Sequence, residues 1–199
     1  MIGYLPASAS ASGNVFPFYE LSNQESNLDS AKTERADVLR ELYIDNLITL
    51  QIVQQPVGNS NFVTQLSNSV TEYKTASDFG TVGLLAHNYL AGQYFFHISP
   101  GQEIELVYED NRTKSFVVTD IQRYQALLPN SPSSDFTDLS TGETFTASQL
   151  FKKVYKNQTG HLVLQTCIKA QQNPSWGRLF IIAEPVRDGP TDNRSEKER

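Results

Sequence analysis

"HLVLQTCIKAQQNPSWGRLFIIA", residues 161–183, contains the single cysteine of this 199-residue chain. The runs 161–168 and 178–186 are rich in apolar and β-branched residues, a composition typical of strands. Because the first run is apolar at successive positions, we expect both of its faces to be buried in the sheet. The segment 169–177 is expected to connect the two strands as a loop.

The same stretch relates the thiol to an arginine. If the two strands pair antiparallel, Cys167 and Arg178 lie nearly opposite each other, roughly 5 Å apart at Cβ. A guanidinium beside a thiol favours the thiolate and can donate hydrogen bonds to a developing oxyanion. A cysteine that serves only in packing, the commonest role of a lone cysteine, needs no such neighbour.

A cysteine nucleophile usually works with a histidine, and the chain has 3. His161 lies on the strand of Cys167, six residues and about 20 Å away, which is too far for contact. His97 lies in "YFFHIS" and is typical of an interfacial side chain. His87 ends the apolar run 81–87 and enters a loop, where rigid scaffolds often present catalytic groups. The spacing therefore favours His87.

The rest of the chain indicates a mostly β domain. Strands are predicted over 47–53, 81–87, 103–109 and 114–124, the last two as a hairpin. A helix is predicted over 146–157, with Thr146 as its N-cap. Residues 54–80 and 129–143 are polar or rich in turn residues and are predicted mainly as loops. Many short strands with few helices favour a barrel or a sandwich.

Three segments are expected along the chain. Residues 1–45 form an N-terminal extension with a helix near 30–43, residues 46–186 form the domain, and 187–199 are a polar tail. The start, "MIGYLPASASASG", resembles a signal-peptide cleavage region, so an upstream start and export are one expectation; an unstructured small-residue start is the other. No stretch reaches the roughly 18 to 20 apolar residues of a membrane span.

Composition excludes several classes of function. The net charge of −6 argues against a nucleic-acid partner. One cysteine excludes an internal disulfide, and the scattered histidines lack zinc-ligand spacing, so neither a metal nor another cofactor is expected. The cysteine motifs of papain-like enzymes and of L,D-transpeptidases are also absent.

Three motifs resemble the sortases, the cysteine transpeptidases of bacterial cell surfaces. "GLLAHN" resembles their strand end with a histidine, "LVLQTC" their T-L-x-T-C strand, and "SWGRLFIIA" the arginine about a dozen residues later. Val163 stands where the cysteine motif has its first threonine. "FFHISPGQEIELVY" and "SFVVTDIQRY" resemble the middle strands, and the resemblance runs from about 47 to 186.

This resemblance implies an eight-stranded β-barrel with short helices. It also implies that Cys167 attacks a peptide carbonyl, that His87 transfers protons and that Arg178 binds the carbonyl or the oxyanion. Three further residues are expected to contact substrate: Thr166, Asn88 and Trp176. The segment 125–160, before the cysteine strand, is expected to shape selectivity for the peptide.

The implied partners are a sorting motif of a secreted protein and an amine acceptor, either a cell-wall precursor or a pilin-like lysine. The implied place of action is extracytoplasmic, at the cell surface, with membrane contact only through an anchor upstream of Met1. Two alternatives remain open. One is a cysteine hydrolase of the same fold, which amine dependence would distinguish. The other is a non-catalytic surface binding module, in which the thiol would react no faster than free cysteine.

Overall fold

The computed structural model describes residues 36–131, 133–170 and 172–187. Its strands are β1 (Leu39–Ile44), β2 (Ile48–Gln54), β3 (Ser69–Glu72), β4 (Val82–Ala86), β5 (Glu103–Tyr108), β6 (Thr113–Ala126), β7 (Phe136–Asp138), β8 (Thr144–Phe145), β9 (Leu162–Ala170) and β10 (Asn173–Pro185). The helical segments are α2 (Lys74–Ser77), η1 (Ala91–His97), α3 (Ala147–Phe151) and η2 (Lys152–Lys156).

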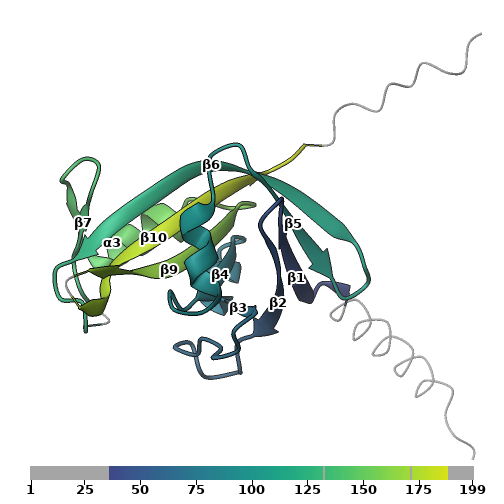
Figure 1. Cartoon of the computed structure of the whole chain (residues 1–199), viewed down its shortest axis with the longest axis horizontal. Helices are drawn as coiled ribbons and strands as arrows, with labels where there is room; N and C mark the ends of the chain where they lie inside the picture. The colour runs from purple at the N-terminus through teal and green to yellow at the C-terminus, as the bar shows by residue number, and fades with distance from the viewer. Residues whose placement is uncertain (1–35, 132, 171, 188–199) are drawn as a thin grey trace, which may run out of the picture.

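The strands close into a barrel (Figure 1). Their order is β10-β9-β4-β3-β2-β1-β5-β6-β7-β8, and β6 also pairs with β10. This second pairing joins eight of the strands in a ring and leaves β7 and β8 as an extension beside β6. The pairs β2–β3 and β4–β9 are parallel and the others antiparallel, so the barrel is mixed. The expected mostly β, eight-stranded barrel with short helices is confirmed.

The long strands separate two apolar cores. On β9, Leu162 and Leu164 belong to the core inside the barrel, whereas Val163 belongs to a second core outside it. On β10, Leu179 is in the inner core and Phe180 in the outer one. The expectation that the strand of Cys167 is buried on both faces is therefore confirmed over its first half.

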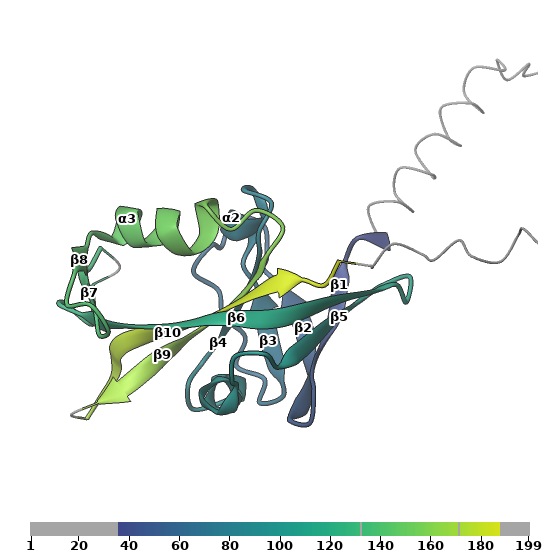
Figure 2. The same cartoon turned by 90° about the horizontal axis from the view of Figure 1, so that it is seen from above.

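Helices cover the outer core. Figure 2 shows α3 and α2 on the same side of the long strands. Thr146 caps α3 as predicted: its hydroxyl accepts a hydrogen bond from the Gln149 amide, and the Gln149 side chain accepts one from the Thr146 amide. The helix continues into η2, a single π-helical turn, and Leu150 and Val154 turn their side chains to the outer core.

The helix expected near 30–43 is wrong for its second half, because residues 39–44 form β1 between β2 and β5. A register shift between Leu39 and Glu41 lets Leu39 and Leu42 share the inner core at a spacing that resembles a helix. The barrel therefore begins at Leu39, before the expected boundary at 46. Residues 30–35, like the expected tail 188–199, lie outside the described residues.

The other predicted strands are confirmed, including the hairpin of β5 and β6. Three predicted loops contain strand residues. Most of 169–177 is strand, since β9 runs to Ala170 and β10 starts at Asn173. The region 54–80 contains β3, and 129–143 contains β7. Both missed strands are short and carry polar residues, so they lack the apolar pattern that predicts a longer strand.

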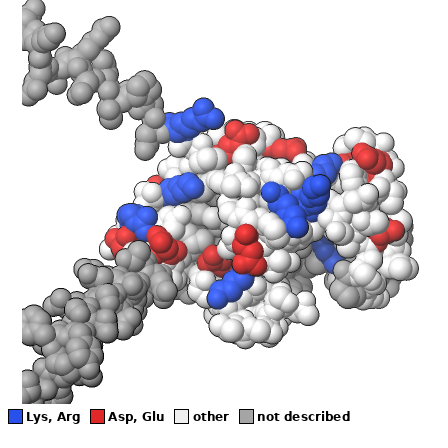
Figure 3. Space-filling view, turned by 180° about the vertical axis from the view of Figure 1, so that it is seen from behind, with Lys and Arg blue, Asp and Glu red and all other residues white. Residues whose placement is uncertain are grey.

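Charge is scattered over one face of the barrel. On the face seen in Figure 3, basic and acidic side chains lie close to one another, and much of the described surface between them is uncharged. Within the described ranges, none of the helices combines the length and apolar character that a membrane crossing requires.

Candidate active site

Neighbouring strands align His87, Cys167 and Arg178 in one row. Cys167 on β9 lies directly opposite Arg178 on β10, which confirms the expected antiparallel pairing. The parallel strand β4 pairs its last residue, Ala86, with Thr166, so His87 follows at the strand end beside Cys167, and both residues line the same cavity. The row faces outward, away from the inner core, because these positions alternate with inward-facing ones.

A second row lies two residues along the same strands. It consists of Leu85, Gln165 and Phe180, which are paired across β4, β9 and β10. Side chains two residues apart on a strand share a face, so both rows form one floor. Phe180 belongs to the outer core, which places this floor beneath the helical layer.

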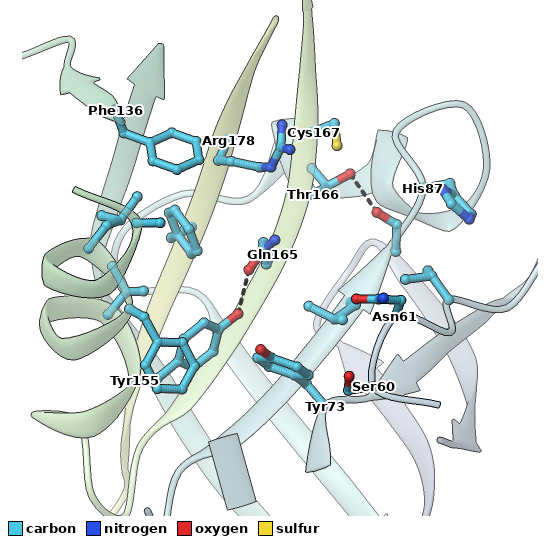
Figure 4. Close-up of a pocket in the computed structure, with 18 of the residues that line it drawn as sticks. Ser60, Asn61, Tyr73, His87, Phe136, Tyr155, Gln165, Thr166, Cys167 and Arg178 are labelled. Atoms are coloured by element: carbon cyan, nitrogen blue, oxygen red, sulfur yellow. Dashed lines mark hydrogen bonds between the residues drawn. The ribbon is translucent and has the colours of Figure 1, made fainter. Parts of the chain in front are cut away.

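The floor and its walls enclose a cavity of about 400 Å³ (Figure 4). One wall comes from α3 and η2, and the other comes from the segment between β2 and β3. The wall residues are Ala147, Leu150, Phe151, Val154 and Tyr155 on one side and Ser60, Asn61 and Val63 on the other. The segment 125–160, expected to shape selectivity, thus supplies the apolar wall.

A buried glutamine braces the irregular wall. Gln55 is 3% exposed, and its Nε2 donates to the carbonyls of Ser60 at 2.9 Å and Phe62 at 3.0 Å. Its Oε1 accepts from the Lys74 amide. One side chain therefore replaces the missing ladder hydrogen bonds of this loop, and it fixes the wall where Asn61 lies.

His87 is held by two neighbours on its outer side. Its Nε2 lies 2.9 Å from Nε2 of Gln65, while Oε1 of Gln65 accepts from the Tyr89 hydroxyl at 3.0 Å. The Tyr89 ring stacks on the imidazole, with centroids 5.2 Å apart. Since an amide nitrogen only donates, Nε2 of His87 is the acceptor in this arrangement, and the ring proton is on Nδ1.

Arg178 is oriented by its own hairpin. Nη1 donates to the carbonyls of Ser175 at 3.1 Å and Gly177 at 2.9 Å. The guanidinium lies over the ring of Phe136, 5.8 Å from the centroid, within the range of a cation–π contact. The remaining guanidinium donors are free of these contacts and available at the Cys167 end of the cavity.

The residues expected to contact substrate have different surroundings. Thr166 lines the cavity but is only 2% exposed, and its hydroxyl donates to the Ala86 carbonyl at 2.8 Å. Asn88 is outside the cavity lining, and its amide donates to the Pro174 carbonyl at 2.9 Å. Trp176 is half-buried and also outside the lining. The geometry gives Thr166 and Asn88 a role in joining β4 and its following loop to the cysteine hairpin.

The cavity has an unusual charge balance. Arg178 is the one permanently charged residue of its described lining, which contains no carboxylate. Among the described residues, no group of three His, Cys, Asp or Glu side chains is arranged to hold a metal ion. No hydrogen bond joins His87, Cys167 and Arg178 to one another within the described part of the chain. Such contacts often tighten only when substrate is bound.

Solved structures resemble this chain over most of its length. Sortase A from Listeria monocytogenes is 13% identical, covers 76% of this chain and 88% of its own, and has a TM-score of 0.46. The sortase D5 transpeptidase of Clostridium perfringens is 12% identical, covers 85% of this chain and 94% of its own, and has a TM-score of 0.49. A lid mutant of sortase A from Corynebacterium diphtheriae is 16% identical, covers 92% of this chain and 86% of its own, and has a TM-score of 0.48. These neighbours are sortases.

No family model matches the sequence, and no curated protein matches it. At the identities and TM-scores above, the similarity to sortases concerns the course of the chain and carries nothing about its chemistry.

Several residues of this candidate site were missed from the sequence. Gln65 and Tyr89 hold His87, Phe136 supports Arg178, and Tyr155 reaches the floor. The position of Gln165, two residues before Cys167 on a strand, was the one available signal, because it places both side chains on the same face.

Proposed function

We propose that this protein is a sortase-type cysteine transpeptidase. It cleaves a short motif in a secreted protein and transfers the acyl part to an amine. The observation that carries the proposal is the row of His87, Cys167 and Arg178 at the end of an apolar groove. The order of the three motifs in the sequence gives independent support.

The first half-reaction forms a thioester. The Cys167 thiol gives its proton to Nε2 of His87, and the resulting thiolate attacks a backbone carbonyl. Arg178 donates hydrogen bonds to the carbonyl oxygen as it becomes negative. Collapse of the tetrahedral intermediate breaks the C–N bond, and protonated His87 gives its proton to the departing amine. The acyl part of the peptide remains bound to Sγ and to the groove.

The second half-reaction forms an amide. An incoming primary amine attacks the thioester, neutral His87 accepts a proton from it, and the Cys167 thiolate leaves. The acceptor is a cell-wall precursor or a pilin-like lysine, which places the reaction at the cell surface. Water in place of the amine would give a carboxylic acid, and the enzyme would then be a hydrolase.

The groove suits a peptide better than a small ligand. Its apolar wall contributes burial along several residues of an extended chain, and its open end holds the reactive groups. The absence of carboxylates from the described lining removes repulsion against the oxyanion. Arg178 is also free of a competing acidic partner there.

The test is amine dependence with a thiol control. Wild type and Cys167→Ala are incubated with a peptide library, with and without a primary amine, and the products are weighed by mass spectrometry. We expect wild type to form amide products and a trapped acyl adduct at Cys167. We expect Cys167→Ala to form neither, while its unfolding curve stays close to that of wild type because Cys167 is only partly buried.

Each other result has a definite meaning. Equal turnover by Cys167→Ala would remove the cysteine from the mechanism. Acid products that do not respond to amine would identify a hydrolase. A Cys167 thiol that labels no faster than free cysteine, with no turnover, would favour a binding module.

A further inference from the structure

One polar side chain occupies the otherwise apolar second row of the groove floor. Gln165 lies between Leu85 on β4 and Phe180 on β10. It shares its face of β9 with Cys167, about 6.6 Å away along the strand. A polar group among apolar neighbours is costly unless its hydrogen bonds are made, so the state of this amide matters.

A buried tyrosine fixes the orientation of the amide. The Tyr155 hydroxyl donates to Oε1 of Gln165 at 2.6 Å (Figure 4). Tyr155 is 2% exposed, and among the described residues its hydroxyl donates to one acceptor, Oε1 of Gln165. Burial raises the pKa of Tyr155 well above its ordinary value, so the hydroxyl keeps its proton. Turning the amide over would leave that proton buried without an acceptor.

The consequence is a directed donor in the cavity. With Oε1 turned to Tyr155, Nε2 of Gln165 lies on the other side, and its two hydrogens are available to a bound molecule. Leu150 and Val154, on the helical wall of the same cavity, offer no competing acceptor in their side chains.

We propose that Gln165 is a specificity-determining residue that donates a hydrogen bond to an acceptor oxygen of the bound peptide. The inference rests on the proposed function. Because an extended peptide advances about 3.3 Å per residue, the acceptor lies roughly two residues from the attacked carbonyl. It is an amide-type oxygen, belonging either to the peptide backbone or to an Asn or Gln side chain.

The test uses a variant that loses the donor without leaving an orphan group. Gln165→Met alone would strand the Tyr155 hydroxyl, whereas Gln165→Met combined with Tyr155→Phe removes both partners at nearly constant shape, which is close to neutral for stability. Tyr155→Phe alone is the matched control, since it keeps the Gln165 donors. Thermal unfolding and the rate of iodoacetamide labelling at Cys167 show whether the double variant keeps its fold and its thiol environment.

The probes are peptides that differ by one acceptor. In one set, two peptides that carry either Asn or Leu at a single position are compared. This is repeated for each of the three positions on either side of the cleaved bond. In the other set, one backbone carbonyl at a time is replaced by a thiocarbonyl, which is a weaker acceptor. The first set reports a side-chain oxygen, and the second reports a backbone oxygen.

We expect one position at which wild type loses about threefold to tenfold in kcat/KM when the acceptor is removed, the scale of one neutral hydrogen bond. The double variant loses this discrimination, and Tyr155→Phe keeps at least part of it. Equal discrimination by wild type and the double variant overturns the inference and leaves the proposed function standing. A wild-type enzyme that turns over no peptide overturns both.

Discussion

The two ends of the groove are built in different ways. At the reactive end, His87 is held by Gln65 and Tyr89, both of which are exposed. At the far end, aromatic rings pack against one another: Tyr155 lies 5.2 Å from Phe151 and 6.2 Å from Phe180, measured between centroids.

The two ends differ in how easily their side chains can change position. Hydrogen bonds to exposed groups contribute little and break readily, so we expect the His87 ring to move toward a bound substrate. The aromatic end is buried in the outer core and resists deformation, because close-packed side chains have no space into which to shift. The groove therefore combines a tightly packed binding surface with a more loosely held histidine, the proposed acid–base group.

Removing the His87 side chain should have the largest effect on turnover. We expect His87→Ala to lower kcat/KM by about 10²–10⁴-fold, the usual contribution of general acid–base catalysis. His161→Ala is the control, because His161 lies at the opposite end of β9 beside Glu184 and should change turnover little. A larger loss in the control would mean that the wrong histidine has been assigned.

Arg178→Lys tests directed hydrogen bonding at the reactive end. Lysine keeps the charge but lacks the planar donor fork, so kcat/KM should fall about 100- to 1000-fold, as for loss of an oxyanion donor. The rate of iodoacetamide labelling at Cys167 should change much less, because alkylation develops no oxyanion.

Two outcomes would revise that role for Arg178. Full turnover by the lysine variant would show that charge alone suffices. Labelling and turnover that fell together would show that the arginine acts mainly on the thiol.

Gly83→Ala tests the rigidity of the far end. A Cβ on Gly83 would lie 2.8 Å from Cβ of Ala76 and 3.2 Å from Cε1 of Tyr155. We expect a loss of about 1–3 kcal/mol in the free energy of unfolding, the usual cost of overpacking, measured by urea denaturation. Adding Ala76→Gly removes the closest contact and should recover part of the loss; no recovery would place the strain elsewhere.

The smallest effect is expected at Gln65. Gln65→Met removes the hydrogen bond to Nε2 of His87 and the one from Tyr89. Because these bonds orient the ring and select its tautomer, kcat/KM should fall about twofold to fivefold. Gln93→Met, at an exposed glutamine outside the cavity lining, is the matched control. If both variants behaved like wild type across the pH–rate profile, the resting contact of His87 would be irrelevant to turnover.

The sequence was most informative where side-chain position follows from strand geometry. The alternation of a strand and the length of a hairpin placed Cys167 opposite Arg178, and the end of an apolar run placed His87 at the end of the neighbouring strand β4. The barrel class followed from the number of short strands and from the three motifs.

Contacts that depend on irregular backbone could not be predicted. Gln65 reaches His87 because the Gln55 side chain braces the preceding loop. No local sequence pattern predicts these contacts. The strand β1 was misassigned because a register shift gave it a helical spacing of apolar residues. The hydrogen bond from Tyr155 to Gln165 requires the π-helical turn to be placed over the sheet, which is a tertiary fact.

The parallel pairing of β4 with β9 also dictates when the site comes into being. The Thr166 hydroxyl and the Ala86 carbonyl that it binds are 80 residues apart in the sequence. During synthesis, His87 emerges long before Cys167, and loop closure over such a distance makes this pairing a late event in folding. Until β9 docks beside β4, the thiol has neither the histidine nor the groove beside it. The nascent chain thus carries an ordinary cysteine, and the candidate site arises only when the barrel is complete.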